Sequence, residues 1–152
     1  EDDVRPMGRA SRGVTGVRFT DADDSVVGGD VVKKGEEGTA ILSVCEKGYG
    51  KRTPLEEYRL QSRGGKGIYT IKVTEKNGPV VSVLQVRESD ELVIMTTEGK
   101  ITRIKVKEIA TIGRLTQGVR LMSVAGSEKI NTVSVFEAEE IIEEEAESEV
   151  VV

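Results

Sequence analysis

The chain has 152 residues with 22 basic and 27 acidic side chains, which give a formal net charge of −5. It contains one Cys and no His, so a disulfide framework and the common zinc sites are excluded. No apolar run reaches the roughly 18 residues that span a bilayer, and no secretory signal opens the chain. The single Cys agrees with a reducing compartment, so we expect the protein in the cytoplasm. Because the chain begins with Glu1 and lacks an initiating Met, we expect it to be part of a longer protein.

The charges divide between a mildly basic body and an acidic tail. Eight Glu and no Lys or Arg occur from Glu137 to Glu149, and without them 22 basic residues stand against 19 acidic ones. Such asymmetry is a reason to consider a nucleic-acid partner for the body. The like charges of residues 138–152 repel one another and leave little to bury. We therefore predict a disordered acidic tail that competes with that partner for the basic face.

Short strands joined by tight turns are predicted from 17 glycines, three prolines and many β-branched residues. Asn77-Gly78 is a strong hairpin signal and Glu98-Gly99 a plausible one, and no stretch before the tail has a helical period. The fold class is therefore all-β. In chain order, strands are expected over residues 14–19, 25–32, 40–46, 51–58, 68–74, 80–87, 92–97, 100–109, 119–125 and 131–136.

The sequence repeats itself with a period of 51 to 54 residues. The pattern Arg, two variable residues, a basic or amide residue, Gly and a β-branched residue occurs within 8–14, 62–68 and 113–119. A second segment, 47–52, matches 98–103 at an offset of 51. A repeated four-stranded unit of about 50 residues is typical of propeller blades. We expect the end of one blade, two nearly whole blades and the start of a last one over 1–137.

The repeated turns have the composition of a phosphate site. Glycine lets backbone N–H groups approach an anion closely, while the flanking Arg and Lys supply charge and hydrogen bonds. Any single copy could equally be a solvated turn with ordinary surface cations. Recurrence favours the functional interpretation, because repeated blades would place such turns at intervals along one rim.

A second cationic feature is the run from Lys100 to Lys107. In a strand, Arg103, Lys105 and Lys107 share one face at steps of about 6 to 7 Å, which resembles the spacing of phosphates along nucleic acid. The alternative is an outer strand that Lys keeps soluble. The earlier copy of this run keeps Arg52 but replaces the two lysines with Pro54 and Glu56, which weakens the pattern.

No enzyme site is predicted in the chain. The glycine-rich turns lack the spacing of a nucleotide-binding loop, no His is available as a general base, and no nucleophile–base pair is evident. Cys45 and Tyr58 are interpreted as core residues. Cationic contacts would hold phosphates without reading base sequence. The residues predicted to contact nucleic acid are Arg9, Arg12, Lys51, Arg52, Arg59, Gln61, Arg63, Gly64, Gly65, Lys66, Gly67, Lys72, Arg103, Lys105, Lys107, Arg114 and Arg120.

The segment Gln61-Ser62-Arg63-Gly64-Gly65-Lys66-Gly67 resembles the box motif of the DNA gyrase A subunit, Gln-basic-Arg-Gly-Gly-basic-Gly, in six of seven positions. Ser62 is the departure. Segments 1–9, 47–53 and 106–119 also look like the C-terminal domain of that protein, so the resemblance covers residues 1–140. By position, the 61–67 copy corresponds to a later blade than the one whose box defines the family.

The resemblance implies a β-pinwheel, which is a propeller-like ring of six blades that exchange strands. In that family the ring wraps duplex DNA around a basic rim, and the holoenzyme uses ATP to introduce negative supercoils. The implied partners are duplex DNA, the gyrase B subunit, and the remainder of the A subunit. No cofactor is implied for this segment, because the catalytic tyrosine lies upstream, and ATP and Mg²⁺ belong to other domains.

Two other functions stay open on the sequence alone. The topoisomerase IV A subunit has a related domain with more degenerate boxes. A propeller-type scaffold could instead bind a protein partner without wrapping DNA, with the acidic tail mimicking nucleic acid. In the gyrase family the tail can modulate wrapping, so deletion from Glu139 onward is expected to tighten DNA binding.

Overall fold

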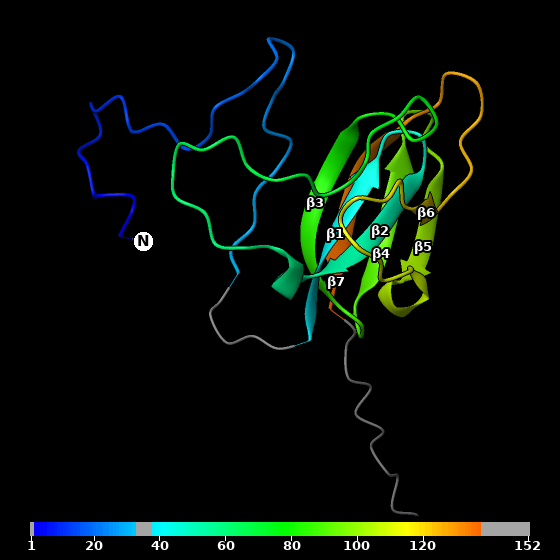
Figure 1. Ribbon diagram of the computed structural model, residues 1–152. Coiled ribbons are helices and arrows are strands. Elements are labelled where there is room, and N and C mark those ends of the chain that lie inside the picture. The colour runs from blue at the N-terminus through cyan, green and yellow to red at the C-terminus, as the bar shows by residue number, and fades with distance from the viewer. Residues whose placement is uncertain (1, 33–37, 138–152) are drawn as a thin grey trace, which may run out of the picture.

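The computed structural model describes residues 2–32 and 38–137, which form β-strands and two short 3₁₀ turns (Figure 1). Within these residues no helix is long and apolar enough to cross a membrane. The strands are β1 (Thr39–Cys45), β2 (Tyr49–Pro54), β3 (Val80–Arg87), β4 (Glu91–Thr96), β5 (Ile101–Lys105), β6 (Val119–Arg120) and β7 (Ile130–Phe136). The 3₁₀ turns are η1 (Leu55–Glu57), after β2, and η2 (Val106–Glu108), after β5.

The strands form two antiparallel sheets, with strand orders β3-β1-β2-β6 and β5-β4-β7. Each sheet begins with a hairpin, β1–β2 or β4–β5. After a long connection, β3 returns to pair with β1 in the first sheet, and β7 returns to pair with β4 in the second. The two-residue strand β6 comes after the second hairpin in the chain but pairs with β2 of the first sheet. This exchange of a strand between consecutive repeats confirms the predicted all-β pinwheel architecture.

The sheets group the strands differently from the sequence expectation. Strand β3 joins the hairpin that precedes it, whereas the repeat pattern placed residues 80–87 with residues 92–109. The second and third repeated turns therefore each lie between the hairpin of one sheet and the strand that returns to it. The position of a strand in a repeat does not say which neighbour it pairs with, since the ladder depends on contacts distant in sequence.

Several predicted strands are confirmed, and others are absent or shorter. The predictions over 40–46, 80–87, 92–97 and 131–136 hold to within a residue or two, whereas 51–58 and 100–109 end early in η1 and η2. The run 119–125 forms only β6. Runs 14–19, 25–32 and 68–74 form no strand; their residues lack a neighbouring ladder among the described residues, except for one bridge between Val17 and Gly65. The predicted acidic tail lies outside the described residues.

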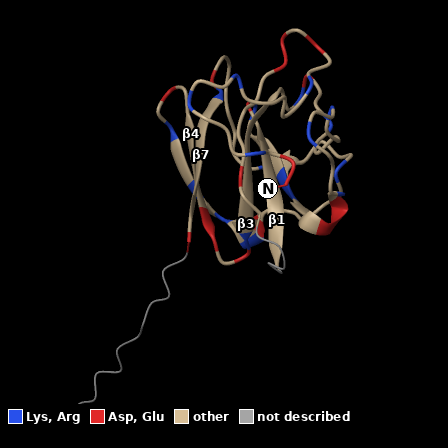
Figure 2. Ribbon diagram, turned by 90° about the vertical axis from the view of Figure 1, so that its left-hand side faces the viewer, with Lys and Arg blue, Asp and Glu red and all other residues tan. Residues whose placement is uncertain are grey.

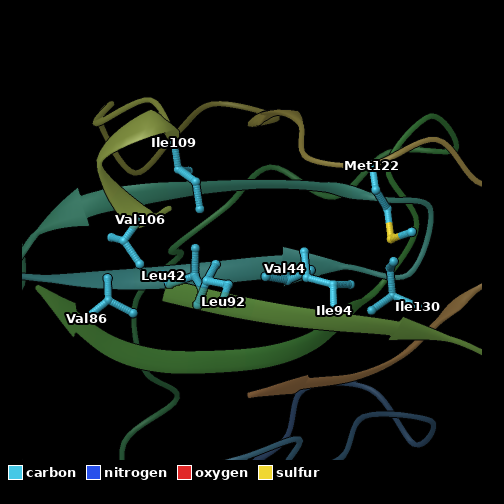
Figure 3. Close-up of a cluster of buried hydrophobic side chains, with 9 residues drawn as sticks. All are labelled: Leu42, Val44, Val86, Leu92, Ile94, Val106, Ile109, Met122 and Ile130. Atoms are coloured by element: carbon cyan, nitrogen blue, oxygen red, sulfur yellow. The ribbon is translucent and has the colours of Figure 1, made fainter. Parts of the chain in front are cut away.

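The core lies between the two sheets. Residues two apart in a strand share a face, so Leu42 and Val44 of β1 and Leu92 and Ile94 of β4 point into one cluster. All four are fully buried, and burial of each such side chain contributes about 1.5–3 kcal/mol. Figure 3 shows the complete cluster, which also contains Val86, Val106, Ile109, Met122 and Ile130. The paired hydrophobic faces thus join one repeat to the next.

Two predicted turns have different outcomes. Glu98-Gly99 joins β4 to β5 as expected, and Gly99 has a φ of 82°, which favours glycine. Asn77-Gly78 does not join two strands. Instead Asn77 is buried, where its side chain accepts the Thr74 N–H at 2.7 Å and donates to Gln117 O at 3.1 Å. A residue type typical of hairpin turns is therefore used to link two loops.

Cys45 and Tyr58 meet different surroundings. Cys45 is fully buried at the end of β1, as predicted. Tyr58 is half-buried, and its hydroxyl forms a short hydrogen bond with the Thr70 hydroxyl rather than lying in the apolar cluster. Burial, with a smaller contribution from the Glu46 carboxylate, raises the pKa of the Cys45 thiol from 9.0 to about 11.

The Cys45 pKa predicts a loss of stability in alkali. The unfolded chain releases the thiol proton at a lower pH than the folded chain. The free energy of unfolding therefore falls as the pH rises from 9 to about 11. Cys45→Ala removes this titration. We predict that its free energy of unfolding falls less between neutral pH and about pH 10 than that of the unaltered chain. Urea unfolding followed by circular dichroism measures the free energy of unfolding of the two proteins at each pH. Equal decreases in the two proteins would contradict the prediction.

Candidate nucleic-acid interface

We use the name box turns for residues 9–13, 63–67 and 114–118, the three copies of the repeated turn. The second lies between η1 and β3, and the third between η2 and β6. Each ends in a glycine with nearly the same left-handed backbone: φ is 78° at Gly13, 80° at Gly67 and 79° at Gly118. Other residues rarely adopt this conformation, which explains why the repeat keeps glycine there. The sequence repeat is therefore a structural repeat.

Consecutive box turns are joined by equivalent backbone hydrogen bonds. The Arg18 N–H donates to Gly65 O at 2.9 Å, so the second box turn lies on the segment after the first. The Lys72 N–H donates to Thr116 O at 2.9 Å, which places the third on the segment after the second. Arg18 and Lys72 are 54 residues apart and Gly65 and Thr116 are 51 apart, which are the two repeat offsets. In Figure 1 the segments 2–32 (blue) and 59–72 (green) accordingly lie side by side.

The box arginines reinforce these junctions. The Arg63 guanidinium donates from Nη1 to Thr15 O at 3.0 Å and from Nε to Asp3 O at 2.8 Å. The Arg114 guanidinium donates from Nη1 to Tyr69 O, the carbonyl equivalent to that of Thr15, at 3.2 Å. Sequence reasoning assigned both arginines to phosphate and missed this role. The recurrence of Arg as the first residue of each box turn was the available signal.

One part of the predicted phosphate cradle is used within the protein. The Gly64 N–H donates to Gly16 O at 2.7 Å, so this amide is not available to an anion. Gly65 and Gly67 are exposed, and beside them Lys66 reaches solvent. Side-chain cations rather than the Gly64 amide therefore remain for a ligand.

Most of the other predicted contact residues lie on the surface. Figure 2 shows that Lys and Arg recur along the loops around the sheets. Arg114 is half-buried against the loop that holds Tyr69. The predicted residues whose side chains are exposed are Arg9, Arg12, Arg59, Gln61, Arg63, Lys66, Lys72, Arg103, Lys105, Lys107 and Arg120. The structure thus brings the first, second and third box turns into one connected set of loops with exposed cations.

Lys51 does not belong to this surface. Its side chain is completely buried, and its ammonium donates to Gly113 O, to Arg114 O at 2.6 Å and to Thr116 Oγ1 at 3.1 Å. Burial lowers the pKa of this ammonium, while the Glu57 carboxylate opposes that shift. The cation therefore fastens the third box turn to β2 from inside, and its prediction as a DNA contact was wrong.

Arg52 has a similar internal role. It is 6% exposed, its Nε donates to Ile109 O at 2.8 Å, and its Nη1 lies 3.2 Å from the Glu88 carboxylate. The predicted contact with DNA is therefore wrong for Arg52 as well. Its interactions connect β2 of the first sheet to the segment after η2, which belongs to the second repeat.

The stripe on β5 is partly as predicted. Arg103 and Lys105 are exposed on alternate positions of this edge strand, and Lys107 is exposed in η2. Arg103, however, forms an ion pair with Glu91. Lys105 and Lys107 have no ion pair within the described residues, although Glu88 and Glu91 line the same shallow hollow. Both the phosphate interpretation and the soluble-edge interpretation fit this arrangement.

The comparisons with known proteins agree with the repeat. The family model described as "DNA gyrase C-terminal domain, beta-propeller" matches residues 1–33, 41–87 and 90–137. Its second and third matches each contain one hairpin, one box turn and one returning strand. The chain belongs to this family.

Among residues 2–32 and 38–137, no group of three or more potential metal ligands is arranged to hold an ion.

Similar curated proteins are gyrase A subunits. The chain is 41% identical over 145 residues to the DNA gyrase A subunit of Ureaplasma parvum, and the match covers 95% of the chain and 17% of the relative. It is 47% identical over 133 residues to the DNA gyrase A subunit of Thermotoga maritima, where the match covers 88% of the chain and 16% of the relative. The chain thus spans about one sixth of the length of these proteins.

Solved structures share the fold. A structure titled "Structure of DNA gyrase A C-terminal domain" has a TM-score of 0.72 and 26% identity, covering 88% of this chain and 44% of that one. The "Crystal structure of the C-terminal domain of DNA topoisomerase IV" has a TM-score of 0.82 at 22% identity, covering 91% and 42%. At this identity the second likeness concerns the fold alone. The sequence relatives favour the gyrase assignment over topoisomerase IV.

The buried position of Lys51 predicts a structural rather than a binding phenotype. Lys51→Ala removes three hydrogen bonds from the buried ammonium and leaves the Arg114 carbonyl without that donor, so we predict a loss of about 2–4 kcal/mol in the free energy of unfolding. Lys105→Ala removes an exposed cation of the same type and should change it by less than about 0.5 kcal/mol. Denaturant titration of both variants checks this. Equal stability of the two would contradict the assignment of Lys51 to the interior.

Proposed function

We propose that this chain binds duplex DNA through backbone phosphates and bends it, as part of the A subunit of a DNA gyrase. The observation that carries the proposal is the connected series of box turns, with exposed cations in the first two turns and Arg120 exposed just after the third. Periodic cations suit a polyanion whose charges recur along its length. The gyrase A relatives and the family match support the same function.

The residues proposed for phosphate contact are those that reach solvent. Around the second box turn they are Arg59, Lys66 and Lys72, and along β5 and η2 they are Lys105 and Lys107. Arg63 is exposed as well, but two of its donors already hold the preceding segment. Contacts of this kind position a duplex without reading its bases, so the binding is independent of sequence.

The whole protein would use this binding in the cytoplasm. Bending or wrapping of DNA against the A subunit would support ATP-dependent negative supercoiling together with the gyrase B subunit. Catalysis, ATP and Mg²⁺ would be supplied by parts of the enzyme outside this segment. The segment contributes geometry and charge rather than bond chemistry.

A scaffold that binds a protein partner is the competing function. It is favoured by large apolar side chains that are exposed on the segments outside the sheets, among them Phe19, Leu60 and Tyr69. Such side chains suit a protein surface better than a phosphate backbone. The two functions differ in their dependence on salt.

We predict that the 152-residue chain binds duplex DNA with an affinity that falls steeply with salt. Lys66→Ala should reduce the slope of log K against log salt by about 0.9, because one phosphate contact is lost. Arg87→Ala is the matched control, since it removes one exposed positive charge on β3, away from the box turns. Fluorescence anisotropy with a labelled duplex measures the slopes.

The outcomes separate the two functions. Absence of salt-dependent binding by the unaltered, folded chain would contradict DNA binding and leave the scaffold. Equal reductions by Lys66→Ala and Arg87→Ala would contradict the box turns as the site, because the effect would then reflect net charge alone.

A further inference from the structure

A basic hollow lies beside the turn between β1 and β2, apart from the exposed cations of the second box turn and β5. It is enclosed by this turn, by the loop before β3 and by the loop between β6 and β7, which is orange in Figure 1. The side chains that line it and carry the argument are Lys47, Tyr49, Lys76, Arg120, Glu128 and Lys129. Four cations thus surround a polar hollow that contains one carboxylate of its own.

Tyr49 forms the floor between two of the cations. Its side chain is nearly buried at 8% exposure, and the Arg120 Nη2 donates to its hydroxyl at 3.0 Å. The Arg120 guanidinium carbon lies 5.5 Å from the ring centroid, and the Lys76 ammonium lies 5.2 Å from it. The hydrogen bond from Arg120 is the largest cause that lowers the pKa of Tyr49, and Lys76 acts in the same direction. The local potential therefore favours negative charge.

Donors remain available in this hollow. Lys76 has no hydrogen bond or ion pair within the described part of the chain, and Arg120 uses only Nη2 of its guanidinium there. The Tyr49 hydroxyl accepts from Arg120, so its own proton is free to be donated. These three groups present convergent donors and two positive charges, which match the oxygens of a phosphate.

The other charges of the hollow are already used. The Lys47 ammonium donates to Glu75 O at 2.5 Å, and the Lys129 ammonium pairs with the Glu46 carboxylate at 3.0 Å. The Glu128 carboxylate accepts the Ala125 N–H at 3.2 Å, and a hydrogen bond from Thr96 helps to lower its pKa. The anion-binding capacity therefore concentrates on Tyr49, Lys76 and Arg120.

We propose that Lys76, Arg120 and the Tyr49 hydroxyl bind a backbone phosphate of duplex DNA. This proposal rests on the proposed DNA-binding function and adds Tyr49 and Lys76 to its contacts. The hollow also lies next to the third box turn, because Asn77, the neighbour of Lys76, donates to Gln117 O at 3.1 Å. A phosphate held here would extend the series of box turns toward the loops at this end of the sheets.

The test uses the complete 152-residue chain and two probes, inorganic phosphate and a duplex. In the phosphate arm, NMR follows the Tyr49 ring resonances during titration. In the DNA arm, anisotropy gives the slope of log K against log salt. Lys76→Ala removes an exposed cation and should leave the fold intact, Tyr49→Phe removes only the hydroxyl, and Arg87→Ala is the charge-matched control.

The expected result is a saturable shift of the Tyr49 ring with phosphate that is lost in Lys76→Ala, weakened in Tyr49→Phe and kept in Arg87→Ala. In the DNA arm Lys76→Ala should lower the salt slope by about 1, uniformly across duplex sequences. No shift of the Tyr49 ring with phosphate, together with a DNA salt slope that Lys76→Ala changes no more than Arg87→Ala does, would overturn the site. A shift with phosphate but an unchanged DNA slope would show a free-anion site and overturn the DNA assignment.

The two arms also separate this proposal from the one on which it rests. If the unaltered chain bound no DNA but phosphate still shifted the Tyr49 ring, DNA binding would fail both as the chain's function and as the role of the hollow. The anion site would stand. If DNA bound with the expected salt dependence and Lys76→Ala behaved as Arg87→Ala, only the proposal for the hollow would fall.

Discussion

The arrangement of this protein depends on hydrogen bonds between each box turn and the segment that follows the preceding one. Arg18 N–H to Gly65 O and Lys72 N–H to Thr116 O are the same bond in successive repeats. Each hydrogen bond contributes about 1 kcal/mol to the net stability of the folded state, so neither would hold a loop alone. The box arginine and its bond to a neighbouring carbonyl add a second fastening at each junction. Because these junctions repeat, Arg12 and Lys66 lie at equivalent exposed positions of the first two box turns.

Cations therefore serve two separate purposes in different segments of each repeat. Lys51 and Arg52 lie inside, where carbonyl oxygens from the following repeat satisfy them, and they fasten one sheet to the next. Lys66 and Lys72 reach solvent from the second box turn and the segment after it. With no Trp and few aromatic residues in the chain, the apolar cluster between the sheets is built of Val, Leu and Ile side chains and Met122. Buried hydrogen-bonded cations supplement it at the junctions.

Local features were predictable from the sequence, and distant pairings were not. The hairpin at Glu98-Gly99, the alternation of Arg103 and Lys105 on β5 and the buried Cys45 depend on neighbouring residues, and the pattern showed them. The burial of Lys51 depends on carbonyls 62 and 63 residues away, which no local pattern reveals. The pairing of β6 with β2 likewise joins residues about 70 positions apart. Residues 25–32 have the composition of a strand, but a strand needs a partner, and none lies among the described residues.

Hydrogen exchange of two amides tests most directly whether each box arginine fastens its own junction. We predict that Arg63→Ala speeds exchange of the Arg18 amide by up to about tenfold, for the loss of one or two hydrogen bonds, and leaves the Lys72 amide unchanged. Arg114→Ala should do the reverse, and the Leu42 amide in β1 should keep its protection in both variants. Unchanged exchange at Arg18 and Lys72, or equal acceleration of both amides in each variant, would contradict this role of the box arginines.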